Sequence, residues 1–218
     1  MKKPRIALVT GFAPFADDTI NPSAEIARKL HGEILDGMLV IGAVLPTEFA
    51  RSLSTLEALI EQHRPALVLA LGLAGGRNEI SLERVAINLI DARIADNAGA
   101  QPMDEAVIAD APTAYFSSLP LKGLLLHLRA LGIPVTISHS AGTFVCNQVF
   151  FGLAHLLATR YPKTIGGFVH VPYLPEQALL HNDAASMPLD MQIAAIRAIV
   201  ETALKQHATP VISGGTTH

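Results

Sequence analysis

The segment Ile133–Asn147 reads IPVTISHSAGTFVCN, and it indicates how this chain folds. The apolar run Ile133–Ile137 is typical of a buried strand, and a turn of small residues follows it. A helical pattern then extends over Phe144–Thr159, with Thr143 as its expected N-cap. The segment therefore predicts a strand, a turn and a helix, which is the repeating unit of α/β proteins.

The single cysteine of the chain, Cys146, falls in the first turn of this predicted helix. Unpaired backbone N–H groups and the positive end of the helix dipole favour the thiolate there, and the thiolate is the nucleophilic form. A lone cysteine among apolar residues is more commonly a buried, inert side chain. Cys146 is thus a candidate nucleophile whose role depends on the rest of the chain.

Apolar strand-like runs alternate with helical patterns along the chain. Runs of this kind, without polar alternation, are typical of a parallel sheet that is covered on both faces. We predict an α/β protein with a single-domain three-layer α/β/α fold and a largely parallel twisted sheet, phosphorylase- or hydrolase-like, over residues 1–218. The tail 207–218 is expected to fray. The expected strands are Ile6–Val9, Met38–Leu45, Ala66–Leu71, Val85–Leu89, Val135–Ile137 and Gly167–Val171, and the expected helices are Pro22–His31, Glu48–His63, Leu121–Leu131, Phe144–Thr159 and Leu189–Gln206.

The composition narrows the possible functions. Hydrophobic residues make up 50% of the 218 residues and charged residues 16%, which favours a well-buried globular protein. The net charge is −3 and no basic cluster extends beyond Lys2 and Lys3, so nucleic-acid binding is not expected. The sequence contains no run of about 18 apolar residues, so no membrane span is expected. The apolar start Ile6–Val9 is too short for a signal peptide, and one cysteine cannot form an intrachain disulfide. We therefore expect a cytoplasmic protein.

Several unusual loops follow the predicted strands. In open α/β sheets, ligands bind beyond the carboxyl ends of the strands, so we expect the functional site where these loops converge. The loops contain GFAPF at Gly11–Phe15, GLAGGR at Gly72–Arg77, the turn before Cys146, and HVPYLP at His170–Pro175.

A histidine at this edge could act as general base for the cysteine. His170 ends an apolar strand, and Pro172 stiffens the chain that leaves it. His139 is the rival candidate, because it lies only seven residues before Cys146.

A carboxylate would orient the imidazole of that histidine. Glu83 leads into the predicted strand Val85–Leu89, and the sequence leaves other carboxylates open as well. They are Asp91, Asp96, Asp104 and Glu176. Neither a His-Glu-x-x-His motif nor a P-loop is present, so we predict no metal site.

Together these segments closely resemble the pyroglutamyl-peptidase I family, also called pyrrolidone carboxyl peptidases. They occur in the family's order, span the chain from about Ile6 to Gln177, and are highly specific as a set. The matching segments are GFAPF (11–15) with NPS (21–23), AGGR (74–77), ERVAIN (83–88), DARI (91–94) with DN (96–97), SAGTFVCN (140–147) and FVHVPYLPEQ (168–177).

The resemblance implies a cysteine exopeptidase that removes N-terminal pyroglutamyl (5-oxoprolyl) residues from peptides through a thioester acyl-enzyme. Residue by residue, it implies that Cys146 is the nucleophile, His170 the base and later the acid, and Glu83 the carboxylate that orients the imidazole. It also implies a cytoplasmic enzyme without a cofactor, often a homotetramer.

The resemblance further implies where the pyroglutamyl ring binds. Phe12 and Phe15, on the first loop, are the expected apolar walls, and Phe144 and Val145 complete them beside the nucleophile. Leu73 departs from the family pattern, because many members have Gln at this position.

The oxyanion site follows in part from the same resemblance. Arg93 matches an arginine placed near the oxyanion in the family. The backbone amide of Cys146, at the start of a helix, is a natural second donor for the tetrahedral intermediate.

Two other readings of the chain compete with the peptidase. A nucleoside phosphorylase-like enzyme has a similar architecture, and Gly72–Arg77 could hold its phosphate. A non-catalytic binding module could also use the scaffold. Phosphate-dependent turnover would identify the first alternative, and ligand binding without turnover the second.

Overall fold

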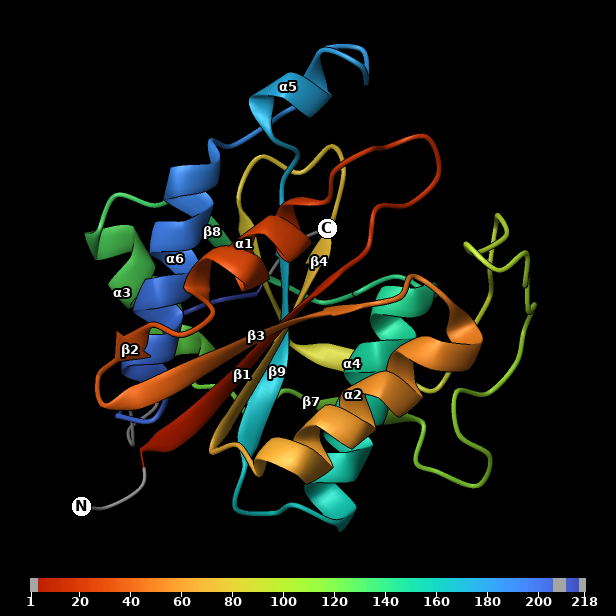
Figure 1. The fold of residues 1–218 in the computed structure, drawn as a ribbon, viewed down its shortest axis with the longest axis horizontal. Coiled ribbons are helices and arrows are strands. Elements are labelled where there is room, and N and C mark those ends of the chain that lie inside the picture. Colours follow the sequence, from red (N-terminus) through yellow and green to blue (C-terminus); the bar gives the residue numbers. More distant parts are fainter. Residues whose placement is uncertain (1–3, 206–210, 216–218) are drawn as a thin grey trace.

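The computed structural model describes residues 4–205 and 211–215. A seven-stranded sheet, in the order β2-β3-β1-β4-β9-β5-β8, forms the middle layer. Helices α1, α3 and α6 cover one face, and α2 and α4 cover the other (Figure 1). The predicted three-layer α/β/α fold is confirmed. The strands are β1 (Arg5–Phe12), β2 (Ile34–Leu35), β3 (Met38–Leu45), β4 (Leu67–Leu73), β5 (Ile80–Glu83), β6 (Val85–Ile87), β7 (Ala114–Phe116), β8 (Val135–Ser138) and β9 (Ile165–Val171), and the helices are α1 (Pro22–Leu30), α2 (Phe49–His63), α3 (Leu121–Ala130), α4 (Val145–Thr159), α5 (Pro175–Ala178) and α6 (Leu189–Ala203).

Four neighbouring strands of the main sheet share one direction, and β2, β5 and β8 run against them. Strands β3, β1, β4 and β9 are parallel, but β5 runs antiparallel to β9, and β8 is parallel to β5. The loop that leads from β8 to Cys146 therefore leaves the sheet in the direction opposite to the chain after β9. The sequence did not indicate this reversal.

The predicted strand Val85–Leu89 was also partly wrong. The chain forms two strands here: β5 in the main sheet, and β6, which pairs with β7 in a separate two-stranded sheet. In β5, apolar Ile80 and Leu82 alternate with polar Ser81 and Glu83, a pattern typical of a half-exposed strand. All four residues are buried; Glu83 contacts His170 and Arg77, whereas the Ser81 hydroxyl has no hydrogen-bond partner among the described residues.

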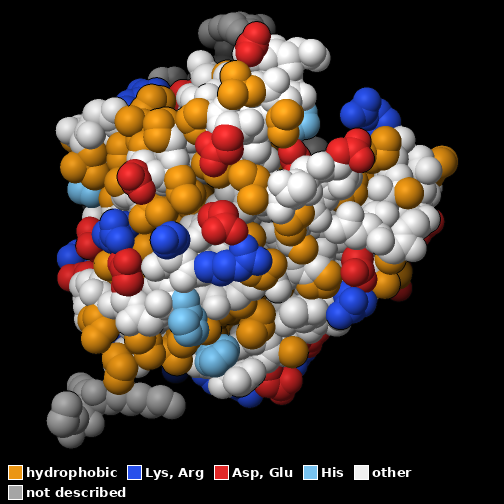
Figure 2. Space-filling view, turned by 45° about the horizontal axis from the view of Figure 1, so that its top comes forward, with side chains coloured by type: hydrophobic (Ala, Val, Ile, Leu, Met, Phe, Trp, Pro, Cys, Tyr) orange, Lys and Arg blue, Asp and Glu red, His pale blue; other side chains and the backbone are white. Residues whose placement is uncertain are grey.

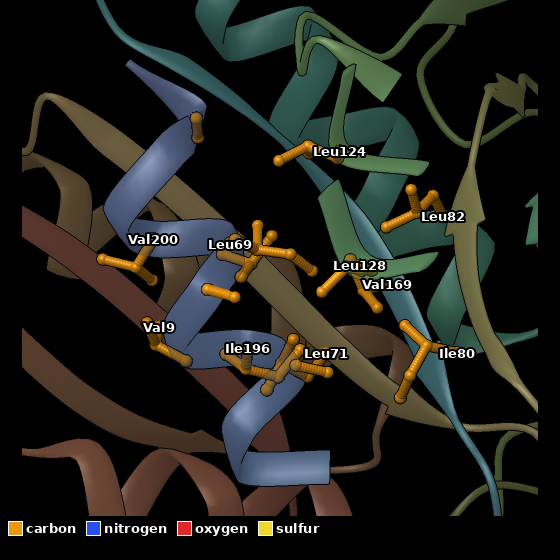
Figure 3. Packing of buried hydrophobic residues seen from close by; sticks show 14 of the residues in the cluster. Val9, Leu69, Leu71, Ile80, Leu82, Leu124, Leu128, Val169, Ile196 and Val200 are labelled. Atoms are coloured by element: carbon orange, nitrogen blue, oxygen red, sulfur yellow. The ribbon is translucent and has the colours of Figure 1, made fainter. Parts of the chain in front are cut away.

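Alternation along the strands divides the core into two clusters. On the face covered by α3 and α6, Leu69 and Leu71 of β4 lie near Ile196 and Val200 of α6, and Val169 of β9 lies beside Leu128 of α3 (Figure 3). Each of these strand side chains is fully buried, so this face is sealed from water.

The neighbouring residues of the same strands point to α2 and α4. Val68 and Ala70 of β4 and Phe168 of β9 belong to the second cluster, together with Phe150 and Leu153 of α4. The next positions along β4 and β9 on this face are Gly72 and His170, where the apolar character ends.

The C-terminal part of the chain is described in two pieces. Helix α6 ends at Ala203, and Gln206, the expected last residue, lies outside the described residues. Of the predicted frayed tail, 207–210 and 216–218 lie outside them too. Residues 211–215 have no helix or strand; Ile212 packs against the first cluster, and the carbonyl of Gly214 accepts a hydrogen bond from Arg84.

On the molecular face shown in Figure 2, acidic and basic side chains are interspersed among hydrophobic ones. Among the described helices, none is long and apolar enough to cross a membrane.

Candidate active site

Strand alternation brings the candidate residues to one face of the sheet. Gly72 of β4 lies directly opposite His170 of β9, and Ser81 of β5 lies opposite His170 on its other side. Glu83 is two residues after Ser81 and therefore points to the same face. This is the face that α4, with Cys146, covers.

Glu83 and His170 form a buried pair. Nδ1 of His170 lies 2.7 Å from Oε1 of Glu83. His170 is 4% exposed and Glu83 is 0% exposed. Because a carboxylate accepts at Nδ1, this nitrogen carries the proton and Nε2 is left as an acceptor. The ring of Phe168 packs against the imidazole, with 4.9 Å between centroids. Both contacts hold His170 in one orientation.

Cys146 lies above the same part of the sheet, at the second position of α4. A Cβ added to Gly72 would lie 2.9 Å from its Sγ, closer than such contacts normally allow. Since Gly72 is the direct neighbour of His170 in the sheet, the thiol sits beside the histidine, and glycine is what lets α4 approach so closely.

The helix that carries Cys146 begins without a side-chain cap. The prediction of Thr143 as N-cap was wrong: the N-cap is Phe144, and the Thr143 hydroxyl donates to the carbonyl of Asp91 at 2.8 Å. The N–H groups of Val145 and Cys146 are among those that no carbonyl inside the helix can reach. Both residues line the cavity described below.

The expected thiolate was also wrong. Burial and the negative charge of Glu83 raise the pKa of Cys146 to about 12, although the Arg77 guanidinium opposes them. Burial would likewise raise the pKa of Glu83, but His170, Ser138 and Arg77 together hold it below its ordinary value. At neutral pH the site therefore contains a protonated thiol and an ionised carboxylate, so Cys146 needs a base.

Of the carboxylates that the sequence left open, Glu83 is the one that contacts His170 within the described part of the chain. Asp96 is buried, but it accepts a hydrogen bond from the backbone N–H of Phe49 and thereby caps α2. The others, Asp91, Asp104 and Glu176, are exposed. His139 is exposed as well and lines a different cavity.

An apolar cavity of about 310 Å³ opens beside the thiol. All five residues expected to bind the ring line it together with Cys146: Phe12, Phe15, Leu73, Phe144 and Val145. The centroids of Phe15 and Phe144 lie 5.2 Å apart, and Phe144 in turn packs edge-on against Phe49. The walls next to the nucleophile are thus aromatic and fixed by packing.

Three further side chains form a rim that the sequence did not suggest. Tyr173 stacks on His181 with 4.4 Å between centroids, and Nε2 of His181 lies 3.0 Å from Oδ1 of Asp18. A Cβ on Gly75 would meet the Tyr173 hydroxyl at 2.4 Å, so this glycine admits the tyrosine. For Tyr173 the sequence offered one signal, its position three residues after the candidate base His170. For Asp18 and His181 the sequence offered no signal.

Arg93 is exposed and is not among the described residues that line the cavity. Its oxyanion role stays a prediction. In the same described part of the chain, no group of three or more His, Cys, Asp or Glu side chains is arranged to hold a metal ion.

A buried Glu–His pair, a cysteine at a helix start and an adjoining apolar cavity are together the features of a cysteine-dependent hydrolase on an α/β fold. The profile of the family described as pyroglutamyl peptidase matches residues 5–206. The chain therefore belongs to the pyroglutamyl peptidase family.

Individual relatives agree with this assignment. The chain is 50% identical over 212 residues to the pyrrolidone-carboxylate peptidase of Cupriavidus taiwanensis, covering 97% of this chain and 98% of that protein. It superimposes on the crystal structure of pyroglutamyl peptidase I from Bacillus amyloliquefaciens with a TM-score of 0.91 and 40% identity, covering 94% and 97% of the two chains. The pyrrolidone carboxyl peptidase of Thermococcus litoralis gives a TM-score of 0.88 and 41% identity, over 92% and 93%.

Proposed function

We propose that this chain hydrolyses the bond after an N-terminal pyroglutamyl residue of peptides, with Cys146 as nucleophile, His170 as general base and acid, and Glu83 as the carboxylate that orients the imidazole. The observation that carries the proposal is the buried Glu83–His170 pair beside a thiol that opens into an apolar cavity. Membership of the pyroglutamyl peptidase family supports the same substrate.

Acylation begins with a neutral thiol, because the pKa of Cys146 is raised. As Sγ attacks the scissile carbonyl carbon, Nε2 of His170 takes the thiol proton, and Glu83 stabilises the imidazolium through Nδ1. Among the described residues no hydrogen bond joins His170 to the thiol, and the proposed mechanism requires the two groups to come within hydrogen-bond distance when substrate binds. The backbone N–H of Cys146 donates to the oxyanion of the tetrahedral intermediate.

Collapse of the intermediate breaks the C–N bond. His170 gives its proton to the leaving amine, which departs as the new N-terminus of the peptide, and the pyroglutamyl group remains on Cys146 as a thioester. A water molecule, deprotonated by the same imidazole, then attacks the thioester carbonyl. Pyroglutamate leaves, and the proton returns to the sulfur.

The cavity suits the pyroglutamyl ring. The ring is flat and uncharged, and it has no free α-amine, so it needs apolar faces and a few backbone donors and acceptors. Phe12, Phe15 and Phe144 supply such faces, and Leu73 adds an apolar wall. Because Leu73 cannot hydrogen-bond the lactam, we assign that task to backbone groups of the adjoining loops.

The direct test is hydrolysis of a pyroglutamyl-amide reporter, with and without a thiol alkylator and with and without phosphate. We expect phosphate-independent turnover that alkylation of Cys146 abolishes. The matched prolyl amide should be cleaved about 10⁴-fold less efficiently, because it lacks the ring carbonyl and would bury a charged amine. Comparable kcat/KM values for the two amides would refute the proposed ring pocket.

We also propose self-association, as a homo-oligomer and in particular a homotetramer. Leu179 and Leu180 follow α5, which projects from the body of the molecule (Figure 1), and they are 75% and 78% exposed. Two adjacent leucines this exposed are suited to burial against a second copy. Sedimentation of the parent and of the Leu179→Ser/Leu180→Ser variant tests this; a 23.1 kDa species alone in the parent at micromolar concentration would contradict it.

The unpaired Cys146 agrees with a reducing compartment, so we propose a cytoplasmic location. Fractionation of cells that produce the chain would test it.

A further inference from the structure

Arg77 contacts both the acid of the candidate triad and the loop that leads to the nucleophile. It lies between β4 and β5, and its Nη1 is 2.8 Å from Oε1 of Glu83. Its Nη2 donates to the carbonyl of Ser140 at 3.2 Å, in the loop between β8 and α4. One guanidinium thus joins the carboxylate to the segment that positions Cys146.

Glu83 is fully buried, and Arg77, after His170 and Ser138, is one of three side chains that lower the pKa of this carboxyl. Its Oε1 accepts from both His170 and Arg77, while Oε2 has no hydrogen-bond partner within the described residues. A buried carboxylate without a compensating positive charge takes up a proton. Among the described groups, the titratable and charged side chains that act on Glu83 are His170 of β9, Arg77, and Cys146 of α4.

We infer that Arg77 is a positioning residue for the peptidase reaction, which keeps Glu83 ionised and aligned on Nδ1 of His170. The inference rests on the proposed function. Arg77 does not touch the substrate cavity beside Cys146; it lines a separate open cavity of about 440 Å³ together with Glu79 and His139. It therefore acts on the reaction through Glu83 and through its charge near Cys146, not through contact with the substrate.

The sign of the pH effect follows from charge. If the positive charge of Arg77 is removed, the Glu83–His170 pair binds its extra proton more tightly, whichever member carries it. A pair that is already protonated cannot accept the proton of Cys146. The acid limb of the kcat/KM profile must then move to higher pH.

Arg77→Met removes the charge and keeps much of the side-chain volume, whereas Arg77→Lys keeps the charge without the planar fork. The matched control is Arg84→Met. Arg84 is adjacent to Glu83 in sequence, but it donates to the carbonyl of Gly214.

For Arg77→Met we expect the midpoint of the acid limb to move to a higher pH by about one unit. At a pH on that limb, kcat/KM should fall about tenfold. Arg77→Lys should keep the parent midpoint at a reduced rate, and Arg84→Met should match the parent. Identical profiles for the parent and Arg77→Met would overturn the inference. So would a loss that is equal at every pH.

A second measurement separates positioning from simple folding damage. In Arg77→Ala the open cavity leaves room for a free guanidinium ion, so millimolar guanidinium should restore activity on the acid limb, while equal sodium chloride should not. Restoration by both salts or by neither would count against Arg77.

The rate at which iodoacetamide alkylates Cys146 gives a readout that needs no peptide substrate. Its acid limb should shift with Arg77→Met as well. If the parent does not cleave pyroglutamyl amides but the alkylation profile still shifts, the proposed function fails and the role of Arg77 stands. If the parent cleaves them and neither profile shifts, the role of Arg77 fails alone.

Discussion

The two faces of the central sheet are made by alternate residues of the same strands, yet they differ in chemistry. Toward α3 and α6, Leu69, Leu71 and Val169 form a sealed apolar layer (Figure 3). Toward α4, the interleaved positions begin as an apolar layer and end at Gly72 and His170. The first face is built for stability throughout, and the second becomes a candidate active site at one end.

The polar end of the second face lowers the stability of the fold. Four buried side-chain atoms of the described residues have no hydrogen-bond partner, and two of them, Oγ of Ser81 and Oε2 of Glu83, lie on β5 at the site. An unsatisfied buried polar group costs about 1–3 kcal/mol. Active sites commonly carry such costs, which the rest of the core has to offset. The sealed face supplies that stability.

The largest effect is expected from Cys146→Ala, which removes the nucleophile from the second face. We expect kcat/KM for a pyroglutamyl amide to fall at least about 10⁴-fold. The melting temperature should stay near that of the parent, because one small side chain changes. Activity within tenfold of the parent would show that another residue is acylated.

His170→Ala should reduce the rate at least about a hundredfold, in line with the contribution of a general base. His139→Ala is the matched control, since His139 is exposed and lies away from the cavity beside Cys146. It should retain most of the activity. The opposite pattern would transfer the role of base to His139.

Leu69→Ala tests the sealed face. Its fully buried side chain packs against α6, so its truncation should lower the free energy of unfolding by about 2–5 kcal/mol. The kcat/KM of the folded enzyme should stay within about threefold of the parent. Urea unfolding at a fixed protein concentration and steady-state kinetics measure the two quantities. A large loss of kcat/KM in the folded variant would mean that the faces are not independent.

The smallest effect is expected from Phe15→Ala, which removes one wall of the ring cavity. A half-buried aromatic ring contributes enough binding to raise KM about tenfold, whereas kcat should change little. Phe116→Ala is the control, because Phe116 is 75% exposed on β7. A fall in kcat with unchanged KM would move Phe15 from substrate binding to the chemical step.

Several features of the fold could be predicted because their signals are local. The apolar run Met38–Leu45 coincides with β3, and helices α1 to α4 and α6 lie close to their predicted bounds. Cys146 could be placed in a first helical turn from the residues around it. The pairing of this cysteine with Glu83 and His170 came from family resemblance, since spacing alone left His139 and four other carboxylates open.

Strand direction and electrostatics required the tertiary structure. Nothing within Ile80–Glu83 indicates that β5 runs antiparallel to β9, yet this pairing is what brings Glu83 to His170. The helix start suggested a thiolate, but burial and the charge of Glu83 reverse that expectation. Arg77 shows the same limit, because its partners Glu83 and Ser140 come from separate segments.

By itself the sequence determined which residues form each element, because periodicity and turn chemistry act over a few residues. Only the tertiary structure decided which charges meet and how water is excluded from them, because these depend on packing between segments far apart in the chain.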